Sequence, residues 1–110
     1  MTKSVSGILV DVHHRRQFKA RITIENGRIS TIEPNDTAPE RFILPGFVDA
    51  HIHIESSMLI PSAFARLAVQ HGTVATVADP HEIANVCGKE GVLYMMEDGE
   101  KVPLKFCFGV

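Results

Sequence analysis

Eight residues, VDAHIHIE at 48–55, alternate apolar side chains with acidic and histidine side chains. Alternate residues of an extended strand lie on the same face of it. The polar face would consist of Asp49, His51, His53 and Glu55. Burying such groups without partners would cost about 2–7 kcal/mol each. The run therefore predicts a strand over 47–54 that packs its apolar face on a helix and uses its polar face as a site.

Strand-like and helix-like segments alternate through the second half of the chain. Pro61 opens a helical segment and Gly72 follows its end. TVATVA at 73–78 is β-branched and strand-like, a second helix is predicted over about 89–97, and LKFCFGV at 104–110 is a third strand. Strands that alternate with helices indicate a parallel sheet, so the predicted fold class is α/β.

The first 34 residues have a different pattern, which indicates antiparallel β structure. FKARITIE at 18–25 alternates apolar and polar residues, and Asn26-Gly27 is a dipeptide typical of tight hairpin turns. The returning segment RISTIEP would place Ile24 opposite Ile29 and Glu25 opposite Arg28. The polar, turn-rich stretch at 34–41 then predicts a linker.

Composition excludes several classes of protein. The chain has 110 residues, 45% of them hydrophobic, and a formal charge of −2. That charge balance gives no basic face for nucleic acid, and no apolar run is long enough to span a membrane. Two cysteines are too few for a disulfide scaffold and suggest a reducing compartment, so we expect a cytoplasmic protein.

His51 and His53 are the predicted metal ligands. Imidazoles at i and i+2 of a strand reach one cation from the same side, and Zn, Mn and Fe all accept imidazole. Both lie at the carboxyl end of their strand, where catalytic groups of α/β barrels are found. The alternative interpretation is a solvated edge strand with a polar face, which the apolar opposite face and the following helix disfavour.

A second polar group, Asp79-Pro80-His81-Glu82, follows the next predicted strand and reaches the same edge of the sheet. Asp79, His81 and Glu82 would bind substrate or an extra metal there, although Asp79 would serve equally well as a helix cap. Glu55, just beyond the first strand, lies near enough to contact substrate.

LPGFVDAHIH at 44–53 resembles the first barrel strand of the amidohydrolase superfamily, which are metal-dependent hydrolases on a (β/α)8 barrel. AHIHIESSML at 50–59 and HGTVATVADPHEIANVCG at 71–88 are similar to the branch of that superfamily that deaminates adenine. The resemblance implies that residues 1–45 form part of a flanking β-sandwich domain. Residues 46–110 would then be the first three strands and two helices of the barrel.

The implied activity is hydrolysis of adenine to hypoxanthine and ammonia by a metal-bound hydroxide. His51 and His53 would be ligands of a binuclear divalent centre of Mn or Fe, with Zn as an alternative. The substrate contacts would come from Glu55, Asp79, His81 and Glu82. The remaining ligands and the acid–base group would lie beyond residue 110, so the chain alone is expected to be inactive and part of a longer, homo-oligomeric protein.

Two rival interpretations stay open at this stage. Another amidohydrolase that acts on cyclic amides, such as a dihydroorotase, would share the His-x-His strand, but the ADPHEIANV stretch at 78–86 argues against it. A small stand-alone metal-binding module is the non-enzyme alternative. The uncovered parallel sheet argues against that module.

Overall fold

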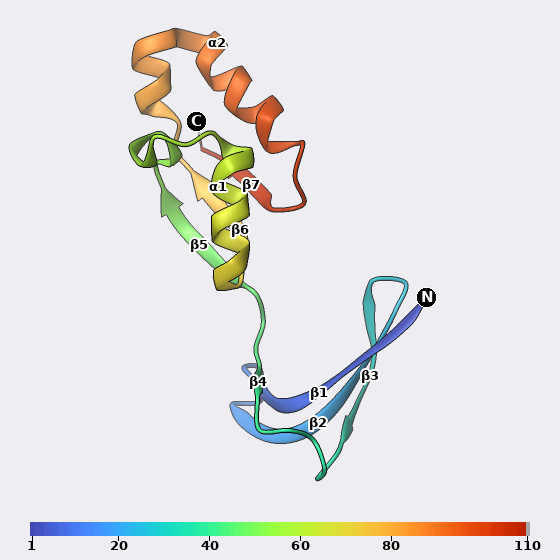
Figure 1. Ribbon diagram of the computed structural model, residues 1–110. Helices are drawn as coiled ribbons and strands as arrows, with labels where there is room; N and C mark the ends of the chain where they lie inside the picture. The colour runs from blue at the N-terminus through green and yellow to red at the C-terminus, as the bar shows by residue number, and fades with distance from the viewer. Residues whose placement is uncertain (110) are drawn as a thin grey trace. The chain divides into compact units, whose positions relative to one another are not determined.

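The computed structural model describes residues 1–109, which divide into two compact units: residues 1–45, and the described residues from Gly46 onward (Figure 1). No helix among the described residues is long and apolar enough to cross a membrane.

The first unit is a four-stranded sheet with the order β3-β2-β1-β4. Its strands are β1 (Thr2–Asp11), β2 (Arg16–Glu25), β3 (Arg28–Pro34) and β4 (Phe42–Ile43). β1, β2 and β3 pair antiparallel, and β4 joins β1 in parallel. Ala20 and Ile22 of β2 are almost fully buried, because apolar residues at alternate positions point to the same side of the strand.

The predicted hairpin is confirmed in its register. Ile24 pairs with Ile29, and Glu25 pairs with Arg28. Asn26 and Gly27 have φ angles of 51° and 75°. Such a turn needs two positive φ angles, which Asn and Gly adopt at little cost.

The second unit holds the α/β architecture that the sequence predicts, with a three-stranded parallel sheet of order β5-β6-β7. Its strands are β5 (Phe47–Ile52), β6 (Thr73–Ala78) and β7 (Lys105–Phe108). Its helices are α1 (Pro61–Ala68) and α2 (His81–Gly99), with short 3₁₀ turns η1 (Ile54–Ser57) and η2 (Val69–His71). Ile54, Ala78 and Met95 form the buried core of this unit, with Phe64 and Phe106 packed against them.

Helix α2 begins earlier than the sequence indicates. The prediction of a helix from about residue 89 was wrong at its start, since the helix begins at His81. The cause is a kink at Gly88, whose φ of 61° and ψ of −152° interrupt the helix and divide it into two segments. The bend is visible in Figure 1. His81 and Glu82 therefore lie in the first turn of α2, in the segment that precedes the kink.

Strand β5 also departs from simple alternation. It ends at Ile52 rather than Ile54, and its register with β6 slips between Asp49, which pairs with Thr76, and Ile52, which pairs with Ala78. Thr76 and Ala78 are two residues apart and share a face, so Asp49 and Ile52 share a face too. This irregularity acts as a β-bulge, which re-aims side chains at the end of a strand. Strict alternation predicts that Asp49 shares a face with His51 and His53. Because of the bulge, Asp49 instead shares a face with Ile52.

Candidate metal centre

His51 and His53 converge at the carboxyl end of β5. Their Nε2 atoms lie 3.1 Å apart, and their rings meet edge to face at 86°. A metal–imidazole bond is about 2.0–2.1 Å, so two nitrogens at right angles on one ion would be about 3.0 Å apart. The observed separation fits two neighbouring ligands of one cation. The carboxylate of Asp49 contacts the backbone of His51: its Oδ1 accepts a hydrogen bond from the His51 N–H at 3.2 Å.

The backbone of Asp79 orients His53. The Nδ1 atom of His53 donates to the carbonyl oxygen of Asp79 at 2.9 Å. A carbonyl oxygen only accepts hydrogen bonds, so Nδ1 carries the proton and Nε2 keeps its lone pair. Metal-binding histidines usually hold their second nitrogen in this way. The contact spans 26 residues of sequence and joins the ends of β5 and β6.

The side chain of Asp79 orients a second imidazole. The Nδ1 atom of His81 donates to Asp79 Oδ2 at 3.0 Å. This hydrogen bond lowers the pKa of Asp79 from its ordinary value, so the group is a carboxylate at neutral pH. The exposed fractions of the two side chains are 53% and 43%, so solvent screens the pair and its value is orientation rather than strength. The Nε2 atom of His81 remains available to a ligand.

Two acidic side chains link η1 to the first turn of α2. The backbone N–H of Ile83 donates to Glu55 Oε1 at 3.2 Å, and Ser56 Oγ donates to Glu82 Oε1 at 2.8 Å. A carboxylate at a helix N-terminus satisfies an unpaired N–H and opposes the positive end of the helix dipole. The other oxygen of Glu55, Oε2, is buried and has no hydrogen-bond partner within residues 1–109.

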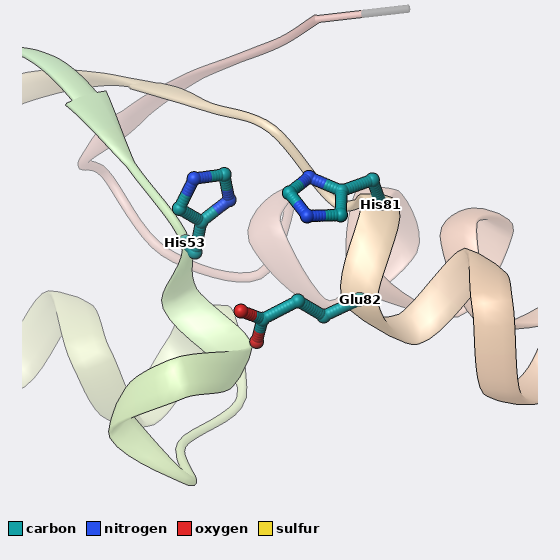
Figure 2. A group of neighbouring side chains, drawn as sticks. All are labelled: His53, His81 and Glu82. Carbon is teal, nitrogen blue, oxygen red and sulfur yellow. The ribbon is translucent and has the colours of Figure 1, made fainter.

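His53, His81 and Glu82 form a cluster with metal-binding potential. One ligand atom from each lies within 4.8 Å of the other two. Figure 2 shows the His81 imidazole directed toward that of His53, with the Glu82 carboxylate beside them. The centroids of the two rings are 4.6 Å apart. Imidazole and carboxylate together suit divalent metals, so these residues fit such an ion.

The residues predicted to form the site lie close together in the structure. The hydrogen bonds that connect them were not indicated by the sequence. Glu55, predicted as a substrate contact, touches the α2 backbone. Asp79 acts through both its carbonyl and its carboxylate. Ser56 is a further member of the site, since its Oγ donates to Glu82 Oε1. Its place in the polar loop directly after Glu55 was the available signal in the sequence.

Comparison with known proteins defines the class. The model of the amidohydrolase family matches residues 42–110, so the chain belongs to the amidohydrolase family. Among curated proteins, it is 60% identical to the adenine deaminase of Methanosarcina mazei over 98% of the chain and 20% of that protein. It is 59% identical to the adenine deaminase of Salinibacter ruber over 96% of the chain, and 63% identical to that of Sulfurovum sp. over 91%. In these two comparisons it covers 19% of each relative.

The chain thus spans about a fifth of the length of the curated relatives that it matches. A solved structure, the crystal structure of an uncharacterized protein, resembles it with a TM-score of 0.52 at 14% identity. That match covers 98% of this chain and 32% of the other. It supports the fold alone.

Proposed function

We propose that this chain is part of an adenine deaminase, which converts adenine and water to hypoxanthine and ammonia. The paired Nε2 atoms of His51 and His53 carry the chemical part of this proposal, because their 3.1 Å separation suits one divalent cation. The purine substrate is supported by the identity of 50–63% to adenine deaminases, which extends through both polar segments of the site.

The reaction needs an activated water and a proton for the departing nitrogen, because an amine attached to an aromatic ring leaves poorly. A bound divalent cation supplies Lewis-acid activation of water near neutral pH. His51 and His53 would hold that cation. The carbonyl of Asp79 keeps His53 in the tautomer that offers Nε2, so the ligand is oriented before the metal binds.

The substrate would lie beside the cation, against Glu55, Asp79, His81 and Glu82. Free acceptor atoms on these side chains suit the N–H groups of a purine base. The exposure of the His81 and Asp79 side chains, 53% and 43%, supports this placement, because a substrate can reach their polar atoms.

The wider architecture follows from the same proposal. The protein would be an enzyme of purine metabolism. Residues 46–110 would form the first part of its (β/α)8 barrel, and residues 1–45 would belong to a flanking β-sandwich domain. The centre would be binuclear, with Mn or Fe as the metal and Zn as the alternative. The full-length protein would be a cytoplasmic homo-oligomer. These features remain predictions.

The test uses the full-length protein with His51→Ala, His53→Ala and the double change. Bound Mn and adenine-dependent ammonia release should fall together, by about 10-fold or more, since each ligand lost weakens the site. His71→Ala is the matched control, because His71 precedes β6 at the opposite end of that strand. A double variant with full metal content and full activity would overturn the assignment. Dihydroorotate hydrolysis without adenine turnover would favour the rival amidohydrolase.

A further inference from the structure

The cluster of His53, His81 and Glu82 overlaps the pair of His51 and His53 without coinciding with it. His51 and His53 present nitrogens 3.1 Å apart. His53, His81 and Glu82 present three donor atoms within 4.8 Å of one another, a group that does not include His51. His53 belongs to both arrangements. The structure therefore contains two neighbouring sets of donors for a cation.

The two sets exclude each other. The Nδ1 atom of His53 is committed to the carbonyl of Asp79, which leaves Nε2 as its one free nitrogen. A single lone pair binds one metal ion. A cation held by His53 with His81 and Glu82 must therefore exchange those two ligands for His51 when it moves to the inner pair.

The set with His81 and Glu82 is the outer one. In the sheet, Ile52 is level with Ala78, so His51 lies within the paired strands while His81 and Glu82 follow the last pair. The carboxyl ends of the strands form the open mouth in α/β barrels. His51 and His81 are both exposed, so position along the sheet separates the two sets: the first turn of α2 carries His81 beyond the end of the paired strands.

Negative charge surrounds the outer set. Asp79 precedes His81 by two residues and Glu82 follows it directly, and Glu55 contacts the same turn of α2. Within the described residues, no Lys or Arg forms an ion pair with any of the three. A cleft lined by charge of one sign attracts the opposite ion and raises its rate of association by about 10–10³.

We propose that His81, Glu82 and His53 form an entrance site that captures a divalent cation and passes it to His51 and His53. This inference rests on the proposed metal centre and adds a path for loading it. His53 stays bound throughout the transfer, while His51 replaces His81 and Glu82. After loading, His81 and Glu82 are free to contact the substrate.

The experiment follows metal uptake by the full-length protein after its metal has been stripped with a chelator. Co²⁺ alone is mixed in rapidly, and its ligand-field absorbance reports binding. His81→Ala and Glu82→Gln should slow uptake by about 10-fold, because an attracting group at the mouth is lost. The final Co²⁺ content should stay that of the unchanged protein. His71→Ala and Glu97→Gln are the matched controls, and neither should slow uptake.

Two results would overturn the entrance site. Unchanged uptake rates in both variants would show that the outer donors do not handle the incoming ion. A lower final Co²⁺ content at an unchanged rate would show that His81 and Glu82 are permanent ligands. Glu82→Gln retains the shape of the side chain, so it decides the question if His81→Ala does not fold. No adenine is present, so failure of this inference is distinct from failure of the deaminase assay.

Discussion

At the scale of single residues, Asp79 performs two separable tasks. Its carbonyl oxygen fixes the tautomer of His53, and its carboxylate fixes that of His81. A side-chain substitution removes only the second contact, because the carbonyl belongs to the backbone. The Asp79–Pro80 peptide favours the extended conformation of Asp79 that directs both groups toward the site. Metal binding and substrate binding should therefore respond differently to changes at this residue.

Replacing Asp79 with Ala in the full-length protein should raise KM for adenine by about 3-fold, because the solvent-screened hydrogen bond that orients His81 is lost. Metal content should change little, since His53 keeps its backbone partner. Asp79→Asn should recover part of the loss, because its amide oxygen still accepts from His81 Nδ1. Steady-state kinetics and metal analysis on the same samples check both points. A metal content that falls in parallel with the rise in KM would contradict this division of tasks.

At the scale of elements, α1 depends on α2 for its N-terminal cap. The residue before α1, Ile60, offers no side-chain hydrogen bond. Asp98, near the end of α2, instead accepts from the backbone N–H of Ser62 at 2.8 Å, and Lys101 Nζ donates to the same carboxylate at 3.1 Å. Asp98 is only 3% exposed. One buried carboxylate thus ties the two helices that pack beside the sheet.

Asp98→Asn should lower the free energy of unfolding at neutral pH by about 1 kcal/mol, the typical effect of losing a helix cap. Burial alone would raise the pKa of Asp98, but hydrogen bonds from Ser62 and Lys101 outweigh it and lower the pKa below 3.8. The stabilisation is therefore present above pH 3.8, the ordinary value, and is lost as the pH falls through the lowered one.

Denaturant unfolding of the full-length protein and its variants, over a pH series, measures this effect. The difference between the unchanged protein and Asp98→Asn should shrink as the pH drops below about 4. Glu97→Gln is the matched control, because Glu97 is an exposed neighbour on the same helix. A gap that is constant with pH would show that the charge of Asp98 does not contribute.

At the scale of the whole molecule, patterns that repeat along an element were predictable from sequence, whereas single-residue irregularities and contacts between distant residues were not. The β2–β3 hairpin follows from an Asn-Gly turn between alternating strands, so its register was predicted pair by pair. The kink at Gly88 and the bulge after Asp49 were missed, because a single glycine or a one-residue slip leaves hydrophobic periodicity almost unchanged. The cap between Asp98 and Ser62 joins residues 36 apart, which no local pattern records.

The candidate site divides in the same way. His51 and His53 were identified because their spacing on a strand brings them to one side. The role of Asp79 in orienting His53 required the three-dimensional structure, because the partner is a backbone atom 26 residues away. For a site built from two strand ends, the sequence therefore identifies each polar segment. It does not predict the contacts between the two segments.

Metal binding should stabilise the two units of the chain unequally. Every candidate ligand lies in the unit 46–110, and the sheet of residues 1–45 has a separate set of strand pairs. A ligand that binds only the folded form stabilises it by about 2.7 kcal/mol at a concentration of 100 times Kd. In the metal-free full-length protein, adding Mn²⁺ should therefore slow hydrogen exchange at the site. Two amides report it: Asp79 N–H, which donates to Ile52 O at 3.0 Å, and Ile83 N–H.

Amides of the hairpin at 16–34 should exchange at the same rate with and without Mn²⁺, because local opening there exposes no metal ligand. Exchange followed by mass spectrometry on peptides from each unit gives the comparison. The double change of His51 and His53 to Ala is the control, and it should abolish the protection at Asp79 and Ile83. Equal protection of both units would mean that the metal stabilises the protein as one cooperative body, which would contradict a local effect centred on the ends of β5 and β6.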